Sequence, residues 1–168
     1  MFYGNAADFK NYLTERGKEV SQDWADSKIE SALLVSSEWL DRKFESLWIG
    51  YKLTYDQLRS WPRQSAVTET FPSYVYKIDE IPYQVVNATY EAAFRELQKP
   101  GCLQVDFTPN KYKSVKVEGA ISVEYNTGFT YASDIQNDFP IIDEIMSGLI
   151  STDKNGNYSP FSGKAVRA

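Results

Sequence analysis

The longest regular pattern of apolar positions in this chain runs through residues 21–44. Its spacing of three and four residues is that of one face of an amphipathic helix. Ser21 and Asp23 are both candidates to cap the first turn of this helix. Leu34 and Trp39 widen the apolar stripe, so we expect the helix to have two packing partners. The main apolar positions are Ala25, Ile29, Ala32, Leu33, Leu40 and Phe44.

Two further stretches have helical spacing. The first covers residues 6–16, with Asn5 placed to cap its start and Gly17 to end it. The second begins at Pro82, because proline has no N–H to leave unpaired in a first turn, and ends before the Lys-Pro-Gly sequence at 99–101. We expect this helix to be the partner of the long one.

The period of the apolar positions falls to two between residues 102 and 126. This alternation is typical of half-buried strands. Two strands alone are barely stable, so the pattern predicts a small antiparallel sheet or ribbon that leans on the helices. The apolar positions of this β element are Leu103, Val105, Phe107, Val115, Val117, Ile121, Val123 and Tyr125.

Residues 45–80 have no clear period but are rich in aromatic side chains. Disordered segments are poor in such residues, so we expect an ordered, extended aromatic loop. Each ring either completes the core or contacts a partner, and the sequence leaves both alternatives open for any single ring. The rings are Trp48, Tyr51, Tyr55, Trp61, Phe71, Tyr74 and Tyr76.

A last helix, very apolar, is predicted over residues 139–150, and it either fills the core or docks on a partner. Residues 151–168 are rich in Ser, Gly and Asn and predict a flexible tail. The fold class predicted is therefore mainly α: a small helical bundle around one long helix, with a small β element, in one domain of residues 1–150.

Composition narrows the possible functions. The chain has 18 basic and 23 acidic residues, a net charge of −5, no histidine and one cysteine, Cys102. No catalytic motif, cofactor-binding loop or metal cluster occurs, so we predict a protein that is not an enzyme. The acidic balance disfavours tight binding to phosphates. One candidate patch for single-stranded DNA is Lys111, Tyr112 and Lys113, where a ring lies beside two cations.

The sequence contains no apolar run of the roughly 20 residues needed to span a bilayer. Its first residues lack the basic and apolar regions of a signal peptide. We therefore expect no membrane association, and a protein made in the cytoplasm or assembled there into a particle.

Several segments, taken in order, resemble a family of tailed-bacteriophage proteins labelled DnaT-like single-stranded DNA-binding proteins. That family is similar in turn to the head–tail connectors of long-tailed phages. The segments are ALLVSSEWLDRKF (32–44), WPR (61–63), IPYQVVNATYEAAFREL (81–97), KVEGAISVEY (116–125) and FPIIDEIM (139–146).

The resemblance implies a structural virion protein, a head–tail adaptor in the capsid neck. Its partners would be further copies in a ring, by resemblance a dodecamer, together with the portal protein and the tail or next connector. An acidic channel wall would let DNA pass without binding it. The competing implication is a single-stranded DNA-binding protein of phage replication. Residues expected to contact a neighbour or the portal are Trp48, Tyr51, Tyr55, Trp61, Arg63, Phe139, Ile142, Ile145, Lys164 and Arg167.

Overall fold

The computed structural model of the chain describes residues 1–68, 72–104, 115–117, 121–123 and 139–151. Within these ranges the fold is mainly helical, with small antiparallel β pairs, as the sequence predicted. The helices are α1 (Ala6–Glu15), α2 (Asp26–Lys43), α3 (Tyr83–Gln98) and α4 (Pro140–Met146). The strands are β1 (Tyr51–Lys52), β2 (Arg63–Gln64), β3 (Val115–Val117) and β4 (Ile121–Val123).

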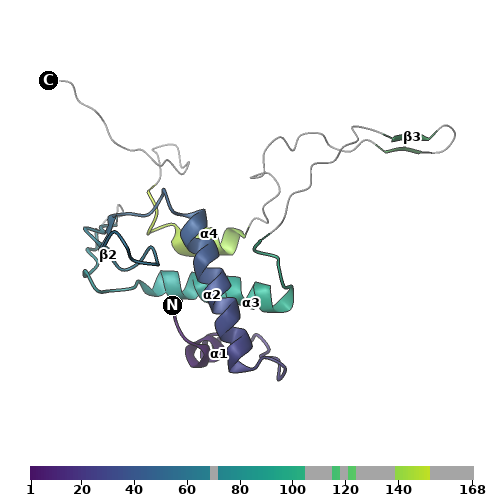
Figure 1. The fold of residues 1–168 in the computed structure, drawn as a ribbon, viewed down its shortest axis with the longest axis horizontal. Helices are drawn as coiled ribbons and strands as arrows, with labels where there is room; N and C mark the ends of the chain where they lie inside the picture. The colour runs from purple at the N-terminus through teal and green to yellow at the C-terminus, as the bar shows by residue number, and fades with distance from the viewer. Residues whose placement is uncertain (69–71, 105–114, 118–120, 124–138, 152–168) are drawn as a thin grey trace.

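Helix α3 is the hub of the bundle. Helix α2 crosses it and makes its most extensive contacts there, and α1 and α4 also contact α3 (Figure 1). The prediction that α2 and α3 are partners is confirmed. Both helices bury small residues where they cross, among them Ser36 on α2 and Ala88 and Ala92 on α3, so their backbones approach closely.

Local capping explains one helix start and not the other. The side chain of Asn5 accepts a 2.8 Å hydrogen bond from the backbone N–H of Asp8, which fixes the start of α1 as predicted. The predicted start of α2 is wrong. Ala25 is its N-cap, without a side-chain hydrogen bond, because Ser21 instead accepts from the N–H of Asp23 in a preceding turn.

The buried apolar residues form two clusters. The first lies between α1, the beginning of α2 and the end of α3, and gives the bundle a closed end. The second joins the end of α2, the beginning of α3, α4 and the aromatic segment. The fully buried members of the two clusters include Phe9, Leu13, Ile29 and Leu33 in the first, and Leu40, Phe44, Trp61, Val85, Ile142, Met146 and Leu149 in the second.

Residues 45–68 and 72–80 fold into a lobe beside the bundle, labelled by β2 in Figure 1. Trp61 is its fully buried centre. Its ring lies edge-on to Trp48, at 5.9 Å, and to Tyr76, at 5.7 Å, and Trp48 in turn contacts Phe44 of the bundle. Such edge-to-face pairs add stability beyond the area they bury. The lobe is thus anchored to the bundle by a continuous row of rings.

The guanidinium of Arg63 is buried in the lobe and joins three of its backbone carbonyls. It donates to the carbonyls of Ile49 at 2.8 Å, Gly50 at 2.6 Å and Ser60 at 3.2 Å. Gly50 has a φ of +68°, and a Cβ there would lie 2.5 Å from the carbonyl oxygen of Gln64. Only glycine fits this position, which lets β1 and β2 pair at the start of the lobe.

The predicted β element is confirmed in part. β3 and β4 pair antiparallel, with Val115 opposite Val123. The predicted strand at Leu103 is wrong at its beginning, since Cys102 and Leu103 lie buried in a turn after α3. The carboxylate of Glu96 closes that turn by accepting from the N–H groups of Gly101 and Leu103. Residues 105–107 of that predicted strand and the predicted tail from 152 lie outside the described residues.

Candidate functional site

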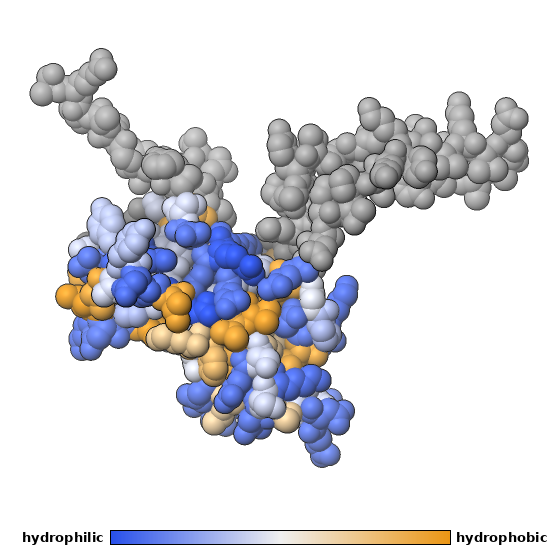
Figure 2. Space-filling model, in the orientation of Figure 1, coloured by the Kyte–Doolittle hydropathy of each residue, from blue (hydrophilic) through white to orange (hydrophobic). Residues whose placement is uncertain are grey.

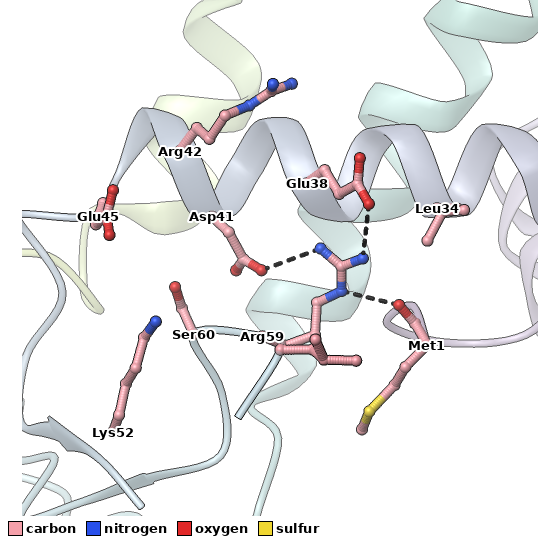
Figure 3. A pocket seen from close by; sticks show the side chains of 10 residues that line it. Met1, Leu34, Glu38, Asp41, Arg42, Glu45, Lys52, Arg59 and Ser60 are labelled. Atoms are coloured by element: carbon pink, nitrogen blue, oxygen red, sulfur yellow. Dashed lines mark hydrogen bonds and ion pairs between the residues drawn. The ribbon is translucent and has the colours of Figure 1, made fainter. Parts of the chain in front are cut away.

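A pocket of about 440 Å³ opens between α2 and the lobe (Figure 3). This volume is within the range of small-molecule sites in proteins. The pocket combines apolar walls with groups of both charges. It is lined by Met1, Leu34, Glu38, Asp41, Arg42, Glu45, Lys52, Leu58, Arg59 and Ser60.

One wall comes from α2 and the turn that follows it. Leu34, Glu38 and Asp41 are spaced by four and three residues, so they follow one another along one side of the helix, and Glu45 lies just beyond its end. The opposite wall comes from segment 52–60 of the lobe, and Met1 also lines the pocket. The pocket therefore exists only because the lobe is held against α2.

Arg59 forms the floor of the pocket and is only 7% exposed. Its guanidinium pairs with Glu38 at 3.2 Å and Asp41 at 3.4 Å, and its Nε donates to the carbonyl of Met1 at 2.8 Å (Figure 3). Asp41 also accepts a 2.7 Å hydrogen bond from the hydroxyl of Tyr3. These contacts tie the first residues, α2 and the lobe together.

The electrostatic environment of Asp41 is unusual for a paired carboxylate. Burial raises its pKa above the ordinary value, even though hydrogen bonds from Tyr3 and Arg59 favour the charged form. Burial, with the Asp41 carboxylate beside it, also raises the pKa of Tyr3, so this hydroxyl remains protonated and donates. The pocket floor is therefore poorly solvated but fully hydrogen-bonded.

Other polar groups in the pocket have no such partners. Ser60 is 3% exposed, yet its hydroxyl has no hydrogen bond to any residue that the structure describes, and it points into the pocket (Figure 3). Arg42, Glu45 and Lys52 likewise form no ion pair within the described ranges. A hydroxyl that faces a pocket and is not used by the protein itself is a candidate contact for a ligand.

The lobe also exposes aromatic rings. Tyr55 is fully exposed, Tyr51 is 71% exposed and Tyr74 is half exposed, whereas Trp48, Trp61 and Tyr76 of the same lobe are buried. Figure 2 shows apolar residues beside charged ones on the surface that carries the lobe. Exposed rings on a rigid support are costly in water and are typical of binding surfaces.

The structure divides the residues that the sequence proposed as contacts. Tyr51 and Tyr55 are exposed, whereas Phe139 and Ile145 are half-buried and pack against the core. The buried remainder, which serves the interior of the subunit and is not available to a partner, is Trp48, Trp61, Arg63 and Ile142. Lys164 and Arg167 lie outside the described residues.

The candidate DNA patch of Lys111, Tyr112 and Lys113 also lies outside the described residues. Over the described ranges, no helix is long and apolar enough to cross a membrane. In the same part of the chain, no group of three or more His, Cys, Asp or Glu side chains is placed to hold a metal ion. The prediction that the protein is not an enzyme stays a prediction.

Sequence reasoning missed the pocket itself. Arg59 was one of several scattered charges, and Ser60 gave no signal at all. The only hint in the sequence is the polar spacing on α2, where Glu38 and Asp41 share one side of the helix and Glu45 follows its end. The same pattern is equally typical of a helix face that is exposed to solvent.

Comparison with known proteins gives one match. Residues 3–168 match the model of a family described as "Putative DnaT-like ssDNA binding protein". No curated protein and no solved structure matches this chain.

This finding corrects the connector interpretation. The matching family is described by binding to single-stranded DNA, and the comparisons give no indication of a head–tail connector, a portal partner or a ring. The expectation that DNA merely passes through a channel is overturned with it. The surplus apolar surface on which that interpretation rested is also smaller than expected, because Trp48, Trp61 and Ile142 are buried. The match agrees with the alternative function, binding of single-stranded DNA.

Proposed function

The chain belongs to the family of DnaT-like single-stranded DNA-binding proteins, and from this premise we propose that it binds single-stranded DNA through the lobe. The observation that carries the proposal is the exposure of Tyr51 and Tyr55 on a lobe whose interior rings, Trp48, Trp61 and Tyr76, are buried. Proteins that bind single strands stack successive bases on such aromatic side chains.

The lobe is a suitable platform because its interior is rigid. Trp61 and Arg63 fix the two strands from inside, so Tyr51, on β1, has a defined backbone position. A ring that is already held in place loses less conformational entropy when a base stacks on it. Base–aromatic stacking is worth about 1–3 kcal/mol per base and tolerates any sequence.

Cations beside the rings are few. Lys52 follows Tyr51 directly, and Arg42 lies across the pocket on α2, both without an ion-pair partner among the described residues. Two neutralised phosphates on a single strand give a slope of log K against log salt of about −1.4. We therefore expect stacking to supply most of the affinity and binding to weaken only moderately with salt.

The direct test is a titration of fluorescein-labelled oligothymidine, about 20 nucleotides long, followed by fluorescence anisotropy at increasing salt. We expect saturable binding at low salt. The Tyr55→Ala variant should bind about fivefold to a hundredfold more weakly, and Tyr51→Ala should lose a similar amount. Absence of binding by the wild-type protein at low salt would overturn the proposal.

Two control variants sharpen this test. Tyr55→Phe keeps the ring and should bind nearly as well as wild type. Ile141→Ala removes a half-exposed apolar side chain from α4, away from the lobe, and should leave binding unchanged. If Tyr55→Phe lost as much affinity as Tyr55→Ala, stacking would not be the mode of binding.

A further inference from the structure

We propose that the pocket between α2 and the lobe holds one unpaired base of the bound strand and selects cytosine and adenine, which carry an amino group at C4 and C6 respectively, over thymine. This inference rests on the proposed function, and it adds a base preference that stacking on tyrosines does not provide. Three features of the pocket carry it.

The first feature is shape. Leu34 on α2 and Leu58 on the lobe line the pocket from its two sides, and both are partly exposed there. Apolar side chains on two sides suit a flat, weakly polar ring better than a phosphate, which needs water or cations around it. A base is therefore the part of a nucleotide that fits this pocket.

The second feature is the carboxylate of Glu38. Its Oε1 pairs with Arg59 at 3.2 Å, while Oε2 forms no hydrogen bond to the described residues, and the side chain is 47% exposed. A carboxylate accepts hydrogen bonds and cannot donate them. Cytosine N4 and adenine N6 are donors, whereas thymine presents the acceptor O4 at the equivalent position. The site thus attracts the amino bases and repels thymine.

The third feature is Ser60. Its hydroxyl points into the pocket and forms no hydrogen bond to the described residues (Figure 3). A hydroxyl both donates and accepts, so it can complete the hydrogen bonds of a base whose amino group lies on Glu38. Because the hydroxyl is open to the pocket, a base that enters can pair with it without breaking a hydrogen bond inside the protein.

The position of the pocket agrees with this role. Its Lys52 and Leu58 come from the same short segment of the lobe as Tyr51 and Tyr55. Lys52 rises from the lobe towards α2, at the side of the pocket (Figure 3). A strand stacked on the tyrosines therefore has a phosphate-binding cation and a base-binding pocket next along the same segment.

The test compares oligodeoxycytidine with oligothymidine of equal length, by anisotropy at about pH 8, where exposed carboxylates are ionised. We expect wild type to bind the cytidine strand about tenfold more tightly. Glu38→Ala should abolish this preference, because the cytidine strand loses its acceptor and oligothymidine, no longer repelled, binds at least as tightly as it does to wild type. Glu30→Ala, an equal charge change at an exposed position of α2 outside the pocket, should keep the preference.

The outcomes separate this inference from the proposed function. If neither strand binds, the proposed function fails and the inference fails with it. If both strands bind equally, the pocket does not read bases, although the protein still binds single strands. Should Glu38→Ala unfold the protein, Ser60→Ala serves instead, since removing an unpartnered hydroxyl leaves the fold intact; an unchanged preference in a folded Ser60→Ala variant would overturn the inference.

Discussion

Two buried polar clusters can be compared within the part of the chain that the structure describes, one of them structural and the other beside the candidate site. Each has a carboxylate that accepts a hydrogen bond from a tyrosine and pairs with an arginine. One, around Glu91, lies in the closed end of the bundle. The other, around Asp41, forms the floor of the pocket. They use the same residue types but leave different groups free.

The Glu91 cluster is saturated. Glu91 accepts from Lys18 at 2.6 Å, Arg95 at 2.7 Å and the hydroxyl of Tyr12 at 3.1 Å. Burial opposes its charged form, yet the hydrogen bonds and charges of Lys18 and Arg95 hold the pKa of Glu91 below its usual value. Burial, with Glu91 close by, raises the pKa of Tyr12 to about 12, so its hydroxyl continues to donate. Nothing in this cluster is left for a ligand.

In the Asp41 cluster one cation, Arg59, pairs with two carboxylates, Glu38 and Asp41. Burial dominates there and raises the pKa of Asp41, although Tyr3 and Arg59 favour the charged form. Around it, the Ser60 hydroxyl and one oxygen of Glu38 have no hydrogen bond among the described residues. Polar groups left free around a hollow indicate a binding site, whereas polar groups that satisfy one another indicate a structural link.

The largest expected effect is on stability at the saturated cluster. Glu91→Gln keeps the size of the side chain but removes a charge that two cations and a hydroxyl contact. Hydrogen bonds to charged groups contribute about 1.5–3 kcal/mol, so we expect a loss of about 2–3 kcal/mol in the free energy of unfolding, measured by urea denaturation at neutral pH. DNA binding should be unchanged. A loss of binding in the folded variant would mean that the closed end also serves a ligand.

A second prediction concerns the pH dependence of that loss. The pKa of Glu91 is lower in the folded state than its ordinary value of 4.5. Its stabilising contribution is therefore complete above about pH 4.5 and is lost as the pH falls through the lower, folded pKa. We expect the difference in unfolding free energy between wild type and Glu91→Gln to narrow over this acid range. If this difference in unfolding free energy stayed constant as the pH fell through the folded pKa of Glu91, the charge of Glu91 would not be what stabilises the fold.

Asp41→Asn should change the free energy of unfolding less than Glu91→Gln does. The contribution of Asp41 to stability should also depend on pH in the opposite direction to that of Glu91. The pKa of Asp41 is raised above 3.8, so its contribution is fully present below that pH and declines as the pH rises through the folded pKa. At neutral pH the variant loses charge-assisted bonds but no longer buries a charge. We expect a net change within about 1 kcal/mol, measured by the same denaturation. A loss as large as that of Glu91→Gln would show that the two clusters are equivalent.

The sequence predicted the helices, which depend on residues close together in the chain, better than it predicted the lobe and the pocket, which depend on distant residues. Helices α1 and α3 follow from local spacing, and the Asn5 cap joins residues three apart. The failure at the start of α2 is also local, since Ser21 can cap a helix or close a turn, and the chain uses the turn. Short-range signals therefore give the existence of helices more reliably than their ends.

The lobe and the pocket depend on contacts between distant residues. Tyr55 and Trp61 are both aromatic residues of a segment without periodicity, yet one is fully exposed and the other fully buried. Nothing in their local sequence distinguishes them. The pocket floor joins Met1, Asp41 and Arg59, which only the tertiary fold brings together. The sequence pattern therefore could not predict the pocket, although it predicted the helix that forms one of its walls.

The smallest expected effect on stability is at Ser60. Its hydroxyl faces the pocket and forms no hydrogen bond to the described residues, so Ser60→Ala should change the free energy of unfolding by less than about 1 kcal/mol whether or not the hydroxyl contacts a ligand. Stability alone therefore cannot separate a structural residue from a ligand contact. Binding can: a ligand contact predicts a stably folded variant with weaker affinity for oligodeoxycytidine. Thermal unfolding and anisotropy on one preparation measure both, and unchanged affinity would leave the Asp41 cluster as structural as that of Glu91.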